Sequence, residues 1–293
     1  MISAVFIYKV KANMNPRFHL HPRKLCMLLV AAFMLNPTAV VAESEFRVCA
    51  EPDNLPFSNR EMEGFENKIA ALLADDLNAK LSYTWEKQKQ GFIRNTLGAN
   101  RCDVVMGVPY GYERVLTTAP YYRSSYVFVS NRDRHMTIES FDDPLLRTLK
   151  IGLHAIGNDG SNSPPAHALA HRGIFNNIVG YSMWGETSVK NPQGMIVEAV
   201  AKGDIDMAIV WGPIGGYFAK AYGEQLTVMP TPSDAELPMQ TFAFDIAIGV
   251  RKGDQAFAAK LEKSLERKRN KIQEILSTYN IPLIKPLTGS DPS

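Results

Sequence analysis

One stretch of the chain, residues 101–122, combines a strand pattern with a polar turn and reads R-C-D-V-V-M-G-V-P-Y-G-Y-E-R-V-L-T-T-A-P-Y-Y. The apolar run Val104–Val108 predicts a short strand that leads into a turn carrying Arg114. α/β proteins hold ligands at the edge of a sheet where such strands end. Residues 203–213, G-D-I-D-M-A-I-V-W-G-P, repeat the pattern. Two such segments predict two lobes that face each other across a cleft.

The rest of the pattern predicts an α/β fold of two doubly wound lobes, with strands and helices alternating along the chain. Strands are expected at Phe46–Glu51, Leu81–Trp85, Asp103–Val108, Lys150–Leu153, Ile178–Tyr181, Ile205–Val210, Leu226–Pro230 and Phe242–Val250, and helices at Gly64–Asn78, Gly91–Gly98, Gly194–Ala201, Gly215–Tyr222 and Gln255–Leu276. A further helix is expected to begin at Pro164 with Ser163 as its N-cap. The alternation predicts a parallel sheet covered on both faces.

The expected lobe boundaries follow from this order of elements. The first lobe comprises residues 46–130 and 242–285, the second lobe comprises residues 131–241, and residues 286–293 form a flexible tail. The chain thus passes between the lobes twice, as in the hinged domain closure of clamshell proteins.

The first 42 residues have the pattern of a secretory signal peptide. Arg17, Arg23 and Lys24 precede the eleven-residue apolar run Leu25–Leu35, and small residues lead to an expected cleavage after Ala42. A short membrane anchor is the alternative, although the run is shorter than the roughly 20 residues that span a bilayer. Either Met1 or Met14 is compatible with the start of such a signal. A Sec-type signal predicts export to the periplasm.

The charge of the mature protein differs from that of the whole chain. Residues 1–42 contain five basic residues and no acids, so their removal leaves 27 basic and 30 acidic side chains and a formal net charge of −3. A mildly acidic protein has no general attraction for nucleic acid or for an anionic membrane surface.

Two cysteines, Cys49 and Cys102, remain after processing. Export places them in an oxidising compartment, and each lies in the pattern of a strand that is expected to neighbour the other. We predict a Cys49–Cys102 disulfide; two buried free thiols are the alternative.

Several polar and aromatic residues are candidates for the cleft. Arg114 follows a strand, where it could clamp a carboxylate or simply pair with a nearby acid such as Glu113. Asn158 lies in a glycine-containing loop before a predicted helix, a weak signal for anion binding. Trp211 ends its strand either as a cleft wall or as a core residue.

The sequence offers little support for enzymatic chemistry. It has no G-x-S-x-G nucleophile motif, no P-loop and no dinucleotide fingerprint. His167 and His171 lie four residues apart, but no third ligand follows them, so we expect no bound metal. We also expect no cofactor and no catalytic residue.

Four motifs resemble the first lobe of extracellular solute-binding proteins of the polar-amino-acid type. They are Gly64-Phe65-Glu66, residues 102–107, Glu113-Arg114 and residues 119–122. The resemblance covers about residues 46–285 and implies the type II periplasmic-binding-protein fold. It also implies that Arg114 corresponds to the arginine that holds an amino-acid carboxylate in that family. Gly111 and Trp211 stand where the family has a Thr or Ser and an Asp, which argues against an amino-acid ligand.

Longer motifs are similar to a narrower family, the quinoprotein-dehydrogenase-associated binding proteins of the MoxJ/XoxJ type. They include residues 49–58 (C-A-E-P-D-N-L-P-F-S), residues 91–97, residues 206–213, residues 249–254 and residues 279–283. This resemblance implies a periplasmic accessory protein that helps a pyrroloquinoline-quinone (PQQ) methanol dehydrogenase mature or become active.

Two functions remain open on the sequence. In the first, the chain is that accessory protein, and its cleft binds the dehydrogenase through residues that include an aromatic rim. The expected cleft residues are Asp53, Asn54, Phe57, Tyr110, Tyr112, Arg114, Asn158 and Trp211. In the second, the chain is the solute-binding protein of an ABC importer for a small anionic or aromatic solute, with Arg114 as the clamp for an anion.

Overall fold

A computed structural model describes residues 44–155, 163–183 and 189–285. Three predicted features lie outside the described residues. They are the signal peptide with its start and cleavage site, the loop segment that contains Asn158, and the C-terminal tail.

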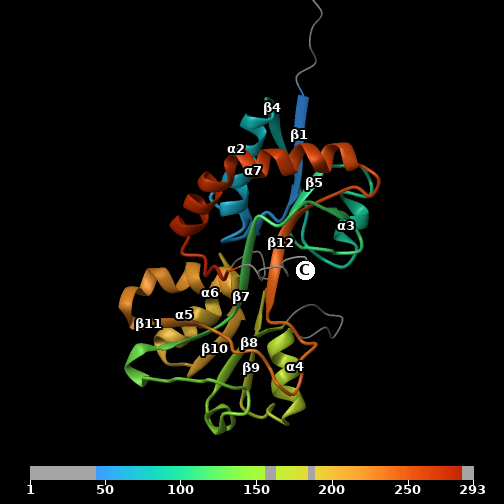
Figure 1. Cartoon of the computed structure of the whole chain (residues 1–293). Helices are drawn as coiled ribbons and strands as arrows, with labels where there is room; N and C mark the ends of the chain where they lie inside the picture. Colours follow the sequence, from blue (N-terminus) through green and yellow to red (C-terminus); the bar gives the residue numbers. More distant parts are fainter. Residues whose placement is uncertain (1–43, 156–162, 184–188, 286–293) are drawn as a thin grey trace, which may run out of the picture. The chain divides into compact units, whose positions relative to one another are not determined.

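The first part of the chain builds one end of a ten-stranded mixed sheet. Its strands β4, β1 and β5 are parallel neighbours, as predicted. The elements are β1 (Ser44–Ala50), β2 (Asp53–Asn54), β3 (Ser58–Asn59), α2 (Phe65–Asp76), β4 (Ala79–Trp85), α3 (Phe92–Asn95), β5 (Val104–Pro109) and β6 (Leu116–Thr117). Helix α7 (Gln255–Thr278) returns to pack on this end, against α2 (Figure 1). We call these elements the first lobe.

The second lobe consists of the elements between residues 131 and 230. Strands β10, β8 and β9 form a parallel set, and helices pack around them. The elements are η1 (Arg132–Arg134), η2 (Pro144–Arg147), β8 (Ile151–Ala155), α4 (Pro164–His171), β9 (Ile178–Ser182), η3 (Pro192–Gly194), α5 (Met195–Lys202), β10 (Met207–Trp211), α6 (Gly212–Ala219), η4 (Lys220–Gln225) and β11 (Leu226–Pro230). The predicted cap of α4 is confirmed, since the Ser163 side chain accepts a hydrogen bond from the Ala166 amide at 3.4 Å.

Two long strands, β7 (Tyr122–Asn131) and β12 (Ala243–Val250), connect the lobes and lie side by side (Figure 1). Strand β7 pairs with β12 over Tyr122–Ser125 and then with β10 over Tyr126–Ser130. Its pairing partner therefore changes inside one continuous strand, between Ser125 and Tyr126. The predicted lobe boundaries at residues 130/131 and 241/242 stay a prediction.

The expectation of a wholly parallel sheet is wrong. Strand β12 runs antiparallel to both β5 and β7, and β7 runs antiparallel to β10 and β11. The reason is that β12 enters the first lobe from the second, opposite to the direction of β5.

The core is divided between the lobes. The first lobe has one buried cluster around Phe65, Ile69 and Leu261, and a smaller one that contains Cys49 and Cys102. The predicted disulfide joins these two cysteines, with their Cα atoms 5.5 Å apart. The second lobe has two buried clusters, one on each face of its strands, as a doubly wound fold requires.

Candidate functional site

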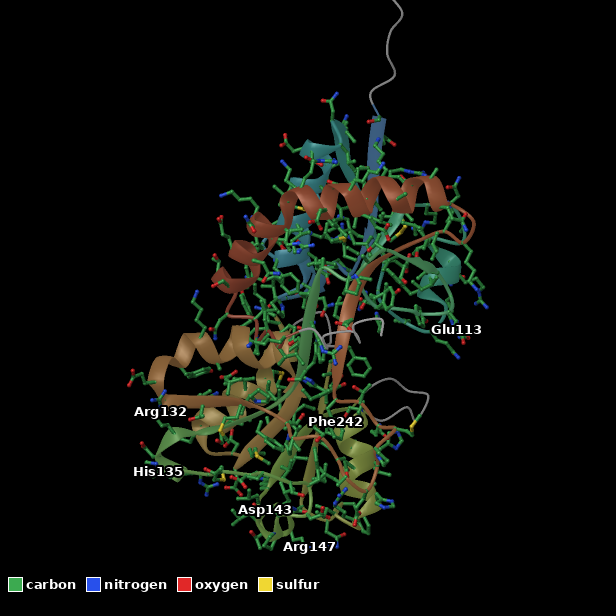
Figure 2. The ribbon with its side chains drawn as sticks, in the orientation of Figure 1. Glu113, Arg132, His135, Asp143, Arg147 and Phe242 are labelled. Carbon is green, nitrogen blue, oxygen red and sulfur yellow. A yellow bond between two sulfur atoms is a disulfide. The ribbon has the colours of Figure 1, made fainter. Side chains whose placement is uncertain are left out.

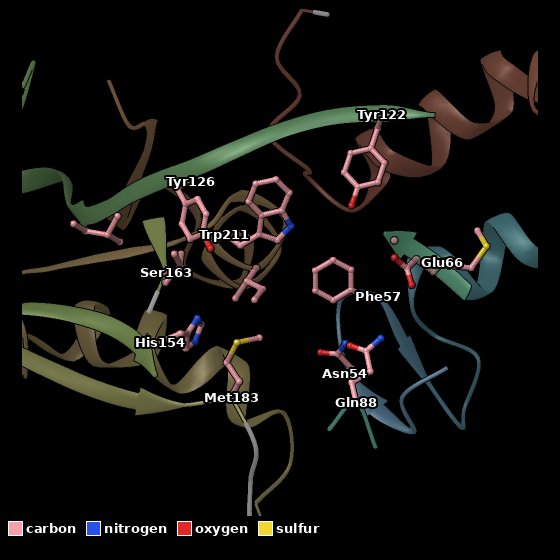
Figure 3. A pocket seen from close by; sticks show the side chains of 15 residues that line it. Asn54, Phe57, Glu66, Gln88, Tyr122, Tyr126, His154, Ser163, Met183 and Trp211 are labelled. Carbon is pink, nitrogen blue, oxygen red and sulfur yellow. The ribbon is translucent and has the colours of Figure 1, made fainter. Parts of the chain in front are cut away.

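A cavity of about 390 Å³ lies between the two lobes, where β7 passes from one to the other (Figure 3). Its described lining comes from both lobes: Asn54, Phe57, Glu66, Gln88, Met106, Gly107 and Tyr122 on one side, and Tyr126, His154, Ser163, Met183, Ile209, Val210, Trp211 and Ile214 on the other. The volume lies in the range of about 300–1,000 Å³ that is usual for ligand sites.

Four aromatic side chains form much of the cavity wall. Tyr122 and Tyr126 are four residues apart on β7, and the two-residue period of a strand places both on one face. Trp211 ends β10 and packs edge-on against Tyr126, with the ring centroids 5.5 Å apart, and against Phe244 at 5.8 Å. Phe57 faces them from the turn between β2 and β3 (Figure 3). Trp211 is thus both a cleft wall and part of the packing.

Gln193 links the lobes through polar contacts at one side of the cavity. Its side-chain amide donates to the backbone oxygen of Asp53 at 2.9 Å and to Oδ1 of Asn54 at 3.1 Å. The backbone oxygen of Gln193 accepts a hydrogen bond from Nε2 of His154 at 3.1 Å. Burial lowers the pKa of His154 to about 4, so the imidazole is neutral at pH 7.

Among the described residues that line the cavity, Glu66 is the only aspartate or glutamate, and none is a lysine or arginine. It lies in the first turn of α2 with 8% of its surface exposed. Its carboxyl group has no hydrogen-bond or ion-pair partner among the described residues. Burial raises the pKa of Glu66 to about 8, so the group is mostly protonated at neutral pH.

Gly107 makes room for this carboxyl group. A Cβ atom at position 107 would lie 2.2 Å from Oε1 of Glu66, and the residue has a φ of +69°. We expect Gly107→Ala to cost about 1 kcal/mol for the backbone conformation and more for the displaced carboxyl group. Gly203→Ala is a matched control, because Gly203 has a similar φ of +79° and open space around it. Urea unfolding of both variants measures the difference, and equal losses would contradict a close fit between Gly107 and Glu66.

Two buried titratable groups at the cavity, Glu66 and His154, predict a characteristic dependence of stability on pH. The folded protein keeps the Glu66 proton up to about pH 8, whereas the unfolded chain loses it near 4.5, so stability falls as pH rises across this range. His154 acts oppositely between about pH 4 and 6.5, where only the unfolded chain binds the proton. The phenols that interact with Glu66, those of Tyr83, Tyr121 and Tyr122, have pKa values raised by burial and stay neutral.

Between pH 6.5 and 8 the effect of Glu66 is larger than the remaining effect of His154. We expect the free energy of unfolding to fall by about 1 kcal/mol over this interval. Glu66→Gln should remove this decline, whereas Glu198→Gln, at a half-buried position outside the cavity lining, should retain it. Urea unfolding at both pH values tests the prediction, and the same decline in Glu66→Gln as in the wild type would contradict it.

The structure brings together some of the residues predicted from the sequence. Asn54, Phe57 and Trp211 line the cavity, and Asp53 contributes its backbone oxygen to the contact with Gln193 while its side chain is exposed. Asn158 lies outside the described residues. The functional roles of these residues stay predictions.

Arg114, Tyr110 and Tyr112 do not line this cavity. The turn after β5 directs Arg114 toward a separate depression near α3, which Arg94, Arg251 and Lys252 also line. Figure 2 shows the neighbouring Glu113 at the outer edge of the first lobe near α3. Tyr110 is 59% exposed and borders another depression beside α7, and Tyr112 is 36% exposed. Of the predicted cleft residues, these three therefore lie apart from Trp211 and the other residues of the cavity lining.

Sequence reasoning missed three residues of this region, Glu66, His154 and Gln193. Glu66 stands in the motif Gly64-Phe65-Glu66, which served only to recognise the family. His154 directly follows a predicted strand, as Trp211 does, so its position could have marked it as a candidate cleft residue. Gln193 lies in the short 3-10 helix η3 before α5, and no sequence pattern marked it.

The described residues give no sign of a metal site or a membrane span. They contain no group of three or more His, Cys, Asp or Glu that could hold a metal ion. His167 and His171 are both exposed on α4, and His171 lies 3.5 Å from Glu236. Within the same residues, no helix is both long and apolar enough to cross a bilayer.

Residues 46–281 match the family model described as bacterial extracellular solute-binding proteins, family 3. The chain belongs to this family. It is 30% identical to Protein MoxJ of Paracoccus denitrificans over 283 residues, which cover 89% of this chain and 97% of that protein.

Two solved structures of family members are similar to this one. MxaJ from Methlophaga aminisulfidivorans MPT is 28% identical, with a TM-score of 0.72. The periplasmic binding protein XoxJ from Methylobacterium extorquens AM1 is 32% identical, with a TM-score of 0.67. In both cases the match covers 82% of this chain and all of the other. The predicted fold class and the resemblance to the MoxJ/XoxJ type are therefore confirmed.

Proposed function

We propose that the protein is a periplasmic accessory factor that binds a PQQ-dependent methanol dehydrogenase and assists its maturation or activation. One observation carries the proposal: an aromatic cavity between the lobes whose described lining has no basic side chain. Such a site suits a protein segment better than a free amino acid, whose carboxylate needs a cation. The similarity to MoxJ and XoxJ supports the choice of dehydrogenase as the partner.

The cavity wall gives the proposal its mechanism. Aromatic side chains contribute strongly to protein interfaces because they bury a large area at a small entropic cost. In the proposal, Phe57 and Trp211 contact a segment of the dehydrogenase from opposite lobes. The strands β7 and β12 allow the lobes to close on that segment, as hinged lobes do on a ligand. The protein contributes binding and no catalytic group.

Association with the dehydrogenase tests the proposal directly. The mature chain, beginning at Glu43, is immobilised and titrated with purified methanol dehydrogenase in its apo and PQQ-loaded forms. We expect Trp211→Ala to weaken the association at least tenfold. Phe175→Ala is the matched control, because this aromatic side chain is 63% exposed and does not line the inter-lobe cavity. No association of the wild type, together with unchanged dehydrogenase activity in a deletion strain, would overturn the proposal.

The importer alternative makes a different prediction. A solute present at 100 times its dissociation constant would stabilise the protein by about 2.7 kcal/mol, which a thermal-shift screen detects. Amino acids, small acids and quinones form the test set. The position of Arg114 outside the cavity lining removes the clamp on which the anion version depended. A clear shift with one of these solutes would favour the importer.

A further inference from the structure

We propose that the inter-lobe cavity binds an alkylguanidinium or alkylammonium group, with Glu66 as the counter-charge and the aromatic wall around the cation. The inference rests on the proposed function only for the source of the group: a lysine or arginine side chain of the partner protein, or a free organic cation.

The first argument is the unpartnered carboxyl group. Glu66 is more than nine-tenths buried, and its carboxyl group points into the cavity beside Phe57 (Figure 3). A buried polar group without a partner costs free energy, and natural proteins keep few of them. Residues 156–162 and 184–188, which the structure does not describe, contain no lysine or arginine in the sequence. The chain itself therefore has no cation in these segments or in the described lining to pair with Glu66.

The second argument is the wall opposite the carboxyl group. Phe57, Tyr122, Tyr126 and Trp211 line the same cavity, and the faces of aromatic rings attract cations. An anion would meet these faces and the carboxyl group of Glu66. A neutral ligand would gain from the rings and could hydrogen-bond the protonated carboxyl group of Glu66, but it would form no ion pair. A cation gains from both.

Binding of the cation requires a proton to leave. At neutral pH the Glu66 carboxyl group is mostly protonated in the empty protein because of its burial. The cation keeps its own protons and binds the carboxylate, and the carboxyl proton passes to the solvent, so charge balances. The phenols of Tyr83 on β4, of Tyr122 at the start of β7 and of Tyr121 just before it interact with Glu66. They stay neutral and do not take up this proton.

Calorimetric titration tests the inference with two probes of equal shape. Butylguanidinium carries the charge and butylurea is its neutral counterpart. At pH 7 we expect butylguanidinium to bind at least tenfold more tightly than butylurea and to release close to one proton, measured in buffers of different ionisation enthalpy. The affinity should rise about tenfold from pH 6 to 7 and level off above pH 8. Equal binding of the two probes, no proton release, or no binding of either probe would overturn the inference.

Variants of Glu66 provide the second measurement. Glu66→Gln keeps the shape and should remove both the preference for the cation and the proton release. Glu66→Asp keeps the charge on a shorter side chain and should retain the proton release with weaker binding. Far-ultraviolet circular dichroism and urea unfolding show that each variant folds. Unchanged discrimination between the probes in folded Glu66→Gln would contradict the inference.

A peptide arm identifies the source of the cation. The probe is a pentapeptide with one arginine among alanines. If it binds at least tenfold more tightly than butylguanidinium, the natural ligand is a protein side chain; if the two affinities are equal, it is a free cation. Either result supports the inference. The dehydrogenase association experiment is independent of these titrations. If the dehydrogenase associates but neither the peptide nor butylguanidinium binds, the inference fails and the proposed function stands. If butylguanidinium binds but the dehydrogenase does not associate, the proposed function fails and the cation site stands.

Discussion

Replacement of Arg172 by methionine is expected to lower the free energy of unfolding by about 3 kcal/mol. The side chain of Arg172 is 5% exposed, and its guanidinium group donates two hydrogen bonds to the carboxylate of Asp234, at 2.8 and 2.9 Å. The Asp234 side chain is fully buried. Removal of the arginine leaves this charge without its counter-ion. The loss stays near the lower end of the range for broken buried pairs, because the amides of Glu236 and Leu237 still donate to Asp234.

The Arg172 variant has two informative controls. Lys202→Met removes the surface Lys202–Glu198 ion pair and should lower the free energy of unfolding far less than Arg172→Met does. The double variant Arg172→Met/Asp234→Asn should recover part of the loss, because the buried side chain is then neutral and still accepts from the two amides. Guanidinium chloride unfolding measures all of them. A loss in Arg172→Met no larger than in Lys202→Met would show that the pair contributes little.

This pair also sets the behaviour of the second lobe in acid. The Arg172 guanidinium group lowers the pKa of Asp234 below its ordinary value. A carboxylate with a lowered pKa contributes stability that is present above the pKa of the unfolded chain and is lost as pH falls through the folded pKa. The pair connects α4 with the segment that leads into β12, so its loss in acid is expected to loosen that return segment.

Removal of the disulfide is expected to cost about 4 kcal/mol. Cys49 and Cys102 are 53 residues apart in the sequence, and the bond restricts the unfolded chain by closing this loop. Both cysteines are buried in the first lobe, so their replacement by alanine also leaves a small cavity. The variant Cys49→Ala/Cys102→Ala, made in the mature chain, isolates the effect.

Comparison with the reduced protein separates the bond from the packing. Wild-type protein kept in a thiol reductant loses the bond but keeps both side chains. We expect it to be about as unstable as the double variant, with unfolding measured in guanidinium chloride. A double variant within 1 kcal/mol of the oxidised wild type would mean that the loop closure contributes little to stability.

The parts of the fold that follow from local sequence were predictable. Helix α2, the cap of α4 by Ser163 and the strands β1, β5 and β10 lie where apolar periodicity and capping residues indicated. The Cys49–Cys102 bond followed from two cysteines on neighbouring strands of an exported chain. The antiparallel course of β12 did not follow, because it depends on the direction in which the chain returns from the second lobe.

Residues of the cavity could be predicted only where they follow a strand whose position the sequence had indicated. Phe57 and Trp211 follow such elements, and both line the cavity. Arg114 follows the right strand too, but several turn residues separate it from β5. The path of that turn, which no periodicity encodes, directs it toward Arg94 and Arg251 instead.

By itself, the sequence determined the family, the two-lobed α/β fold, the disulfide and two aromatic residues of the inter-lobe wall, Phe57 and Trp211. These depend on residue type and spacing along one chain. Only the tertiary structure decided that Arg114 lies outside the cavity and that Glu66 is its buried acid. Both outcomes depend on distances between segments remote in sequence, such as the close approach of Gly107 to Glu66. Burial then sets the charge of Glu66, because the free energy of an ionised group depends on its surroundings and not on its neighbours in the sequence.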